Sequence, residues 1–463
     1  MRIMFKVNEL LKATGGRLIN AKGDISIRGI SIDSRTINSQ DAFIAIRGNN
    51  FDGHNFIEES IKKGASCVIK ESRFKIDAGS WMIGNRRKVA LLEVKDTIKA
   101  LGDIARYHRS KFDIPIIAVT GSNGKTTTKE MAAWILSKKY KVLKNEGTKN
   151  NQIGLPLTLL SLNNYHDIAV LELGTNHFGE IDYLARVCQP NIGIITNIGL
   201  AHLEYLHNLE SVFKEKYTLI KNLQRPYVAI LNADDGLLRK KIAGMSKKAF
   251  ILGFGVKNKS DFFAAHIREL NGKTEFLLQK YRFTLNTLGV YNIYNASAAI
   301  AVARIFGIGL RSIASRLTTF HFPQSRLKLI TLNKIKFIDD TYNSNPASLK
   351  HALDTLNNFK IKGRKIFVMG DMLELGRYNR LFHCRVGRDV AKVCDVFISV
   401  GELSKLTAKA AVALGFDIKN MFTCATCSEA RDILLNKVSP RGKDIVLVKG
   451  SRLMKMEEIF RTQ

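Results

Sequence analysis

The residues best suited to chemistry stand in one short stretch, residues 115–127, which reads PIIAVTGSNGKTT. An apolar run meets a turn where Gly121 and Gly124 can adopt backbone angles that other residues avoid, so that N–H groups can point at phosphate oxygens. Lys125 adds a charge for the β- and γ-phosphates, and Thr126 adds a hydroxyl suited to Mg²⁺. We therefore predict a nucleotide site at Gly121, Ser122, Asn123, Gly124, Lys125, Thr126 and Thr127.

A helix must follow this turn if its positive end is to face the phosphates. Met131, Trp134 and Ile135 recur at i, i+3 and i+4, which predicts that helix. The pattern is Gly-x-x-Gly-Lys-Thr and lacks the first glycine of the full phosphate-loop motif, since Val119 stands there. A glycine turn that only starts a helix is the alternative, and the attached Lys-Thr-Thr disfavours it.

The elements that must position this stretch form a mostly parallel sheet. Apolar runs at 168–171, 192–195 and 228–231 alternate with helical segments between about residues 87 and 323. Ligands of such sheets bind at the carboxyl ends of the strands. Polar residues at these ends are therefore candidates for the site.

Two of these polar residues are candidate metal ligands. Glu172 directly ends the first run, where a carboxylate is costly to bury without a partner, and His202 follows the second run by a short loop. With Thr126 they could hold a metal ion, although a lone histidine is more often structural. Lys216 lies in a predicted helix, residues 212–223, where by itself it would belong to an exposed charged face.

The chain divides into three predicted α/β domains, residues 1–86, 87–323 and 324–463. In the last domain, runs at 337–338, 366–369, 396–400 and 445–448 alternate with helical segments in a Rossmann-like order, without a dinucleotide glycine motif. A cationic turn in this domain, predicted to open a helix, is a plausible carboxylate receptor. Its residues are Lys449, Gly450, Ser451 and Arg452.

Two weaker signals complete the candidates. Ser34 and Arg35, with the loop at 52–54, could hold a phosphorylated ligand or could be ordinary turn residues. Asn292 and Asn295 lie on one side of an Ala-rich helix, where amides suit adenine edges but also serve as caps.

Composition bounds the class of protein. The chain has 463 residues, 45% of them hydrophobic, and no run long enough to span a membrane. No signal-peptide core is found at the N-terminus, so we expect a cytoplasmic protein. Six scattered cysteines make no disulfide framework, and we interpret the Cys424–Cys427 pair as incidental thiols.

The net charge of +31 attracts polyanions, but the basic residues are dispersed, so we favour anionic small-molecule substrates over nucleic acid.

Taken in order, these segments resemble the ATP-dependent Mur ligases of peptidoglycan precursor synthesis, over essentially the whole chain. Residues 120–127, the 289–296 segment and Arg326 are marks of the whole family. Marks of one member, the ligase that adds D-alanyl-D-alanine (D-Ala-D-Ala) to UDP-N-acetylmuramoyl-tripeptide (UDP-MurNAc-tripeptide), occur in five further segments. These are residues 172–181, 197–204, 340–343, 370–376 and 449–452.

The resemblance implies roles for individual residues. Lys125 would bind ATP phosphates, Thr126 and Glu172 one Mg²⁺, and His202 a second. Lys216 would be carbamylated by CO₂, which would give an anionic oxygen pair able to support a metal ion or water. Asn295, Arg326 and Asp340 would surround adenine, phosphate and ribose. The predicted substrate contacts are Ser34 and Arg35 to uridine, Asn150 and Asn151 near the muramoyl group, and Tyr342, Asn343, Lys449, Ser451 and Arg452 to the dipeptide.

The chain departs from the family pattern at three positions. Tyr291 stands where histidine is usual, Thr148 where the loop before Asn150 usually has Asn, and Gln40 where glycine is common. The first concerns contacts at the domain junction, and the other two concern substrate positioning.

The resemblance implies a reaction through an acyl phosphate, in a protein that we expect to be a monomer. The peptide carboxylate would attack the γ-phosphate of ATP, and the dipeptide amine would then displace phosphate. The alternatives are the tripeptide-forming ligase, whose Asp-Asn-Pro-Arg run is missing here, and folylpolyglutamate synthase, against which the N-terminal domain argues. A basic phosphate-loop protein that binds nucleic acid is a third alternative, which leaves Glu172, His202 and Lys216 unexplained.

Overall fold

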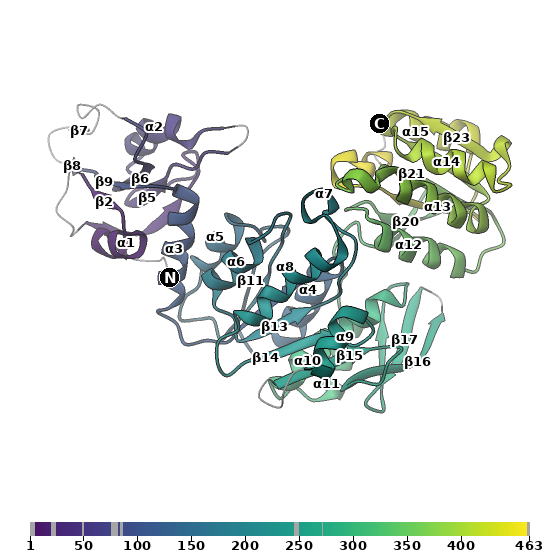
Figure 1. The fold of residues 1–463 in the computed structure, drawn as a ribbon, viewed down its shortest axis with the longest axis horizontal. Helices are drawn as coiled ribbons and strands as arrows, with labels where there is room; N and C mark the ends of the chain where they lie inside the picture. Colours follow the sequence, from purple (N-terminus) through teal and green to yellow (C-terminus); the bar gives the residue numbers. More distant parts are fainter. Residues whose placement is uncertain are drawn as a thin grey trace.

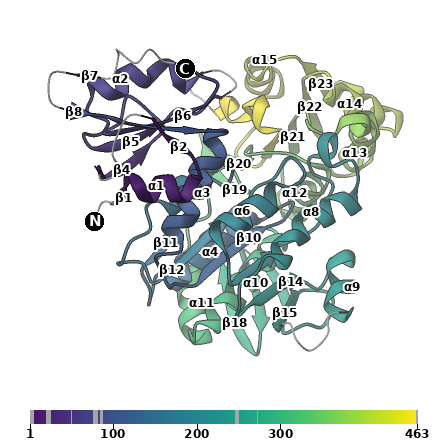
Figure 2. The same cartoon turned by 60° about the vertical axis from the view of Figure 1, so that its left-hand side comes forward.

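The computed structural model describes residues 5–19, 25–48, 51–75, 82–83, 87–244, 250–270 and 272–460. In this part the chain forms three α/β units, each built on its own large sheet (Figure 1). In Figure 1 and Figure 2 the first unit (purple) and the last (green to yellow) lie above the central unit (blue to teal). The predicted three-domain α/β architecture is confirmed.

The first unit has a five-stranded sheet in the order β2-β9-β6-β5-β4. Its last strand in sequence, β9 (Ala90–Val94), pairs parallel with β6 and antiparallel with β2. This sheet therefore includes residues beyond the predicted boundary at residue 86, which itself lies outside the described residues. The other elements here are β1 (Phe5–Lys6), α1 (Val7–Thr14), β2 (Arg17–Leu18), β3 (Ser26–Ile27), β4 (Gly29–Ser31), β5 (Asp41–Ile44), α2 (Ile57–Lys62), β6 (Cys67–Glu71), β7 (Met82–Ile83) and β8 (Arg87–Lys88).

The central unit has nine strands in the order β11-β12-β10-β13-β14-β15-β16-β17-β18. The pairs from β11 to β16 are parallel, and the last three strands form an antiparallel extension that the sequence reading did not predict. The strands are β10 (Ile116–Thr120), β11 (Val142–Lys144), β12 (Ile168–Glu172), β13 (Ile192–Ile195), β14 (Val228–Asn232), β15 (Phe250–Gly255), β16 (Phe262–Leu270), β17 (Lys273–Leu278) and β18 (Tyr281–Leu285).

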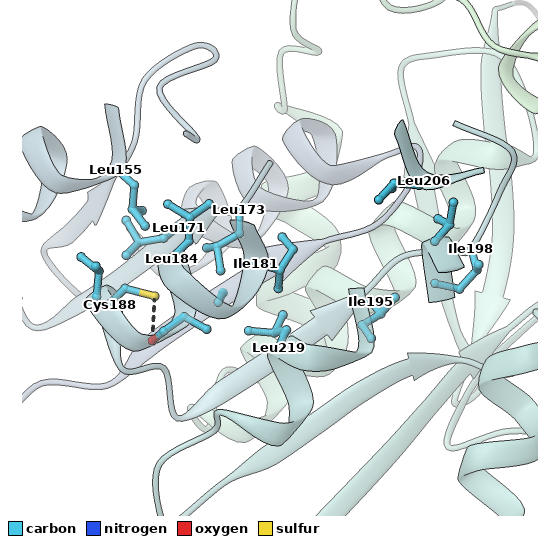
Figure 3. Close-up of a cluster of buried hydrophobic side chains, with 14 of the residues drawn as sticks. Leu155, Leu171, Leu173, Ile181, Leu184, Cys188, Ile195, Ile198, Leu206 and Leu219 are labelled. Atoms are coloured by element: carbon cyan, nitrogen blue, oxygen red, sulfur yellow. Dashed lines mark hydrogen bonds between the residues drawn. The ribbon is translucent and has the colours of Figure 1, made fainter. Parts of the chain in front are cut away.

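Strand β10, which lies between β12 and β13, is buried on both faces, because its side chains alternate between two hydrophobic clusters. Ile117 and Val119 pack in one cluster with residues of α4 and α10, and Ile116 and Ala118 belong to the other. Figure 3 shows part of the second cluster, where Leu171 of β12 lies near Leu184 of α6. The helices of this unit are α3 (Thr97–Arg109), α4 (Lys125–Leu136), α5 (Gly154–Leu159), α6 (Glu180–Cys188), α7 (Leu203–Leu206), α8 (Leu209–Lys221), α9 (Gly236–Gly244), α10 (Tyr291–Ile305) and α11 (Leu310–Thr318).

The third unit has six strands in the order β19-β20-β24-β21-β22-β23, parallel except for β19. All four predicted strands are present, and β19 and β23 are additional. No helix in the described residues is long and apolar enough to cross a membrane. The elements are β19 (Lys328–Leu332), β20 (Ile335–Asp340), α12 (Pro346–Asn358), β21 (Lys365–Gly370), α13 (Asn379–Val393), β22 (Val396–Val400), α14 (Ser404–Ala413), β23 (Met421–Cys424), α15 (Cys427–Asp432) and β24 (Ile445–Lys449).

Candidate functional site

The predicted phosphate loop joins β10 to α4, and side chains from other segments pack closely against it. Gly121 has a φ of 147° and Gly124 a φ of 81°, both in the region that favours glycine. A Cβ atom at Gly124 would lie 2.3 Å from Oδ1 of Asn295, and one at Gly121 would lie 1.9 Å from Oγ1 of Thr196. Both positions therefore require glycine for steric reasons as well.

Lys125 is the first residue of α4 and folds back over this loop. Its Nζ atom donates a hydrogen bond to the carbonyl oxygen of Gly121 at 2.8 Å. Burial lowers its pKa, an effect that the nearby Glu172 carboxylate opposes. The ammonium is thus held at the loop, where a phosphate group would add a further counter-charge.

Thr126, Glu172 and Arg326 meet at the carboxyl end of the sheet. Oγ1 of Thr126 donates to Oε2 of Glu172 at 2.7 Å and accepts from Nη2 of Arg326 at 3.0 Å. The other oxygen of Glu172 accepts from Nδ2 of Asn150 at 2.7 Å. The hydroxyl and carboxylate oxygens that Mg²⁺ prefers are therefore side by side, with the guanidinium of the third unit next to them.

Asn145 was not singled out in the sequence, yet it fixes the backbone of Glu172. Its Oδ1 accepts from the Glu172 amide at 2.8 Å, and its Nδ2 donates to the Glu172 carbonyl at 3.0 Å. Asn145 is fully buried. No local pattern could have revealed it, because the two residues meet only when β11 and β12 pair.

His202 follows β13 and reaches the third unit. Its Nδ1 lies 2.7 Å from Oε2 of Glu374. Burial lowers the pKa of His202, whereas the hydrogen bond from the imidazole lowers the pKa of Glu374. Both shifts favour a neutral imidazole facing an ionised carboxylate.

Lys216 lies in α8 and is 1% exposed. Burial, with a contribution from the charge of Lys125, lowers its pKa to about 7. No hydrogen bond to its ammonium is found among the described residues. A large part of this amine is therefore uncharged, and so nucleophilic, near neutral pH.

Asn295 and its neighbours close the loop on the side of α10. Nδ2 of Asn295 donates to Oδ1 of Asn292 at 3.1 Å, so the two amides do lie on one side of the helix. Tyr291, at the position where histidine is usual, accepts from Nδ2 of Asn197 at 2.8 Å and lies 4.7 Å, between ring centroids, from His351 of α12. Asn197 in turn accepts from the Asn123 amide at 3.0 Å.

Asp340 and Lys449, predicted to serve ribose and dipeptide separately, are paired with each other. Nζ of Lys449 donates to Oδ2 of Asp340 at 2.5 Å and to the Asn343 carbonyl at 2.9 Å. The Leu327 amide donates to Oδ1 of Asp340 at 3.2 Å. Burial raises the pKa of Asp340 despite this partner.

The turn after β24 is not followed by the α-helix expected from the sequence but by a short 3₁₀ helix, Arg452–Met454. Oγ of Ser451 accepts from the Leu373 amide at 2.8 Å, and Arg452 pairs with Glu457 at 2.8 Å. Ser451 therefore links this turn to the loop after β21, whereas Arg452 pairs within its own segment.

Tyr342 lies beside Arg326, whereas Ser34 and Arg35 lie in the first unit and pair with residues there. The guanidinium of Arg326 lies 3.8 Å from the centroid of the Tyr342 ring. In the first unit, Oγ of Ser34 donates to Glu59 at 3.0 Å, and Arg35 is exposed and paired with Asp33 at 2.7 Å. Hydrogen bonds from the side chain and backbone of Arg35 lower the pKa of Asp33 to about 2.

A cavity of about 470 Å³ between the central and third units collects most of the predicted residues, and its size is in the range of small-ligand sites. Glu374 and Tyr291 line it too, although neither was predicted as a site residue. The predicted residues that do not line it are Gly121, Lys216, Ser34, Arg35, Ser451 and Arg452.

Among the described residues, no group of three or more His, Cys, Asp or Glu side chains could hold a metal ion. Thr126 and Glu172 nevertheless fit Mg²⁺, which is commonly bound through one or two protein oxygens together with substrate phosphates and water. The donor set therefore suits a metal ion that arrives with a nucleotide.

Three family models together match most of the chain. Residues 26–109 match the Mur ligase family catalytic domain, 119–303 the Mur ligase middle domain, and 325–452 the Mur ligase glutamate ligase domain. The second segment contains the phosphate loop and Glu172, and the third contains Arg326 and Glu374.

Several relatives match over nearly the whole of their length. The chain is 33% identical to the UDP-N-acetylmuramoyl-tripeptide--D-alanyl-D-alanine ligase of Bacillus subtilis, over 98% of this chain and 97% of the relative. It is 33% identical to the ligase of that name from Escherichia coli, over 99% and 98%. A crystal structure of MurF from Acinetobacter baumannii is 33% identical and has a TM-score of 0.88, covering 99% and 98%. MurF of Thermotoga maritima in complex with ADP is 26% identical, with a TM-score of 0.81 over 93% and 96%.

Proposed function

Because this chain belongs to the Mur ligase family, we propose that it is the ATP-dependent ligase that joins D-Ala-D-Ala to UDP-MurNAc-tripeptide in peptidoglycan precursor synthesis. The observation that carries the proposal is the Thr126–Glu172 contact of 2.7 Å beside Lys125. It lies in a cavity between two units of a chain that matches such ligases over 97% or more of their length.

The proposed reaction has two steps. A terminal carboxylate oxygen of the tripeptide attacks the γ-phosphorus of ATP, which gives an acyl phosphate and ADP. The amine of D-Ala-D-Ala then attacks the acyl carbon, forming the amide bond as inorganic phosphate leaves and the amine loses a proton. Lys125, held at the loop by Gly121, offsets charge on the transferred phosphoryl group.

Mg²⁺ would be held by Thr126 and Glu172, with His202 at a second ion. When bound, the ions supply positive charge that stabilises the phosphates in the transition state. Asn150 orients Glu172 through its second carboxylate oxygen, and Arg326 reaches Thr126 from the third unit. Thus the third unit contributes a cation to the same group of atoms.

The remaining assignments divide the substrates among the three units. The first unit would bind uridine at Ser34 and Arg35, and Asn150 and Asn151 would approach the muramoyl group. Adenine would lie at Asn295 and the ribose near Asp340. The dipeptide would contact Tyr342, Asn343, Lys449, Ser451 and Arg452. We place the protein in the cytoplasm, as a monomer.

We also propose that CO₂ carbamylates Lys216. The pKa of about 7 and the lack of a hydrogen bond among the described residues support an uncharged amine that can attack CO₂. The N–C bond forms as the amine loses a proton, so a cation is replaced by an anionic oxygen pair. A ¹³C resonance of a carbamate from ¹³CO₂ that is absent in Lys216→Ala would support this assignment, and its absence from the unchanged protein would refute it.

The test of the reaction measures phosphate release from ATP with UDP-MurNAc-tripeptide, with and without D-Ala-D-Ala, while mass spectrometry follows the product. We expect release to require both substrates and the product to gain one dehydrated dipeptide. Lys125→Ala is expected to abolish turnover, whereas Lys138→Ala, on the exposed end of the same segment, should leave it unchanged. Near-normal turnover in Lys125→Ala would refute the ATP site.

Two other outcomes would redirect the proposal. Turnover with a single amino acid on a shorter precursor would indicate the tripeptide-forming ligase. Affinity for RNA that falls steeply with salt, without any ligase activity, would instead favour nucleic-acid binding by the +31 charge.

A further inference from the structure

The contact between His202 and Glu374 joins two units across the cavity. His202 follows β13 of the central sheet, and Glu374 lies in the loop after β21 of the third unit. Nδ1 of His202 lies 2.7 Å from Oε2 of Glu374, and both residues line the cavity. No other side-chain partner of the imidazole is found in the described part of the chain.

The backbone around this contact is shaped to bring the two residues together. His202 has a φ of 54° and Glu374 a φ of 63°, left-handed angles that such residues rarely adopt. The Glu204 amide donates to the Glu374 carbonyl at 3.1 Å. A Cβ at Gly376 would lie 3.1 Å from Cα of Glu204, so the two loops are in close contact. The side-chain contact therefore belongs to an ordered junction between the two loops.

The hydrogen bond has a chemical consequence for the imidazole. A carboxylate only accepts, so Nδ1 of His202 must carry the proton that it donates to Glu374. In a neutral ring the lone pair then lies on Nε2, which becomes the nitrogen able to bind a metal ion. A carboxylate in this place also fixes the orientation of the ring.

We propose that Glu374 is a positioning residue that holds His202 in the Nδ1–H tautomer, with Nε2 free for the second metal ion. The third unit thereby takes part in a metal site whose ligand belongs to the central unit. This inference rests on the proposed function, because it assumes that His202 binds a metal ion. The metal site is therefore complete only when the loop of His202 and the loop of Glu374 are docked.

The alternative is an interdomain contact that only stabilises the arrangement of the units. The side chain of Glu374 keeps 39% of its surface exposed, so its truncation removes little buried area and the variant should fold. The two alternatives differ in what they predict for the tautomer and for metal binding, and neither readout depends on turnover.

The first measurement is the tautomer of His202 in protein with ¹⁵N-labelled histidine. The chain has ten histidines, and His202→Gln assigns the resonance. We expect Nδ1 to be protonated in the unchanged protein and the Nε2–H form to gain population in Glu374→Ala. The same tautomer ratio in both proteins would overturn the proposal.

The second measurement is Mn²⁺ binding, followed by electron paramagnetic resonance with a non-hydrolysable ATP analogue. Loss of such a carboxylate partner typically weakens metal affinity about 10- to 100-fold, and we expect that loss in Glu374→Ala. Glu374→Gln keeps an acceptor oxygen and should fall between the two. Glu204→Gln removes an equal charge from the same junction without touching the imidazole, and should match the unchanged protein.

Equal Mn²⁺ affinity in Glu374→Ala and in the unchanged protein would overturn the proposal, as would an equal loss in Glu204→Gln. If the unchanged protein binds neither the nucleotide analogue nor Mn²⁺, the proposed function itself fails. The experiment therefore separates the two failures.

Discussion

Replacement of Lys449 by methionine would decide between two roles for this residue. The sequence predicts a receptor for the dipeptide, whereas the structure places the ammonium, 1% exposed, on Asp340 and the Asn343 carbonyl. Asp340 is itself only 9% exposed. Lys449→Met therefore leaves a buried carboxylate with one hydrogen bond, from the Leu327 amide.

The size of the stability loss in Lys449→Met follows from this burial. Removal of one partner of a buried pair costs about 3–5 kcal/mol, because the other charge stays uncompensated. The pKa of Asp340 is raised even with Lys449 present, so burial already outweighs the pairing. Removal of the lysine raises that pKa further, and the carboxyl is then protonated more readily. We therefore expect a larger loss of stability at pH 8 than at pH 5.

Hydrogen exchange of the β20 and β24 amides measures this loss locally, which suits a chain of three units better than a global unfolding curve. The double variant Asp340→Asn, Lys449→Met should lose much less stability than Lys449→Met, because no unpaired charge remains. A loss below about 1 kcal/mol in Lys449→Met, with a raised KM for D-Ala-D-Ala, would refute this reasoning and support the dipeptide receptor.

Two further predictions follow from the site. Gly124→Ala should abolish ATP binding in calorimetric titrations because its Cβ meets Asn295. Gly179→Ala, with a similar φ of 85° and open space around its Cβ, should bind ATP normally. Equal losses of ATP affinity in the two variants would show that backbone strain alone matters. Lys216 has a pKa of about 7 when folded and 10.5 ordinarily, so the unfolded chain binds more protons between these values and stability should rise with pH there. Hydrogen exchange of the α8 amides in CO₂-depleted buffer, corrected for the intrinsic pH dependence of exchange, should show a gain of about 1 kcal/mol per pH unit relative to Lys216→Met, and parallel pH profiles would contradict the buried amine.

Local patterns were sufficient to predict the phosphate loop and the strands around it. Spacing of Gly121, Gly124 and Lys125 within one turn determines which atoms face a ligand. Parallel strands bring their carboxyl ends to one edge, which is why Thr126 and Glu172 were expected to meet and do meet. The roles assigned to individual site residues stay predictions.

Contacts between distant segments could not be predicted in this way. Glu374 is 172 residues from His202, and Lys449 is 109 residues from Asp340. Such pairs depend on how the third unit docks and on which strands become neighbours, and neither leaves a periodic signal. In the antiparallel β16–β18 extension, a register shift between Ala265 and Arg268 interrupts the alternation of β16. Strand β17 does alternate in burial, so its pattern was present in the sequence and was missed.

The cavity wall is shared between two units, with Lys125 and Thr126 on one side and Arg326 and Glu374 on the other. A small inhibitor that fills this cavity contacts both units and stabilises the arrangement in which they are docked. Its apparent affinity is its intrinsic affinity multiplied by the fraction of molecules in which both walls are in place. A screen therefore detects compounds that contact both walls of the cavity only when the assay contains substrates, or uses conditions, that keep the two units docked.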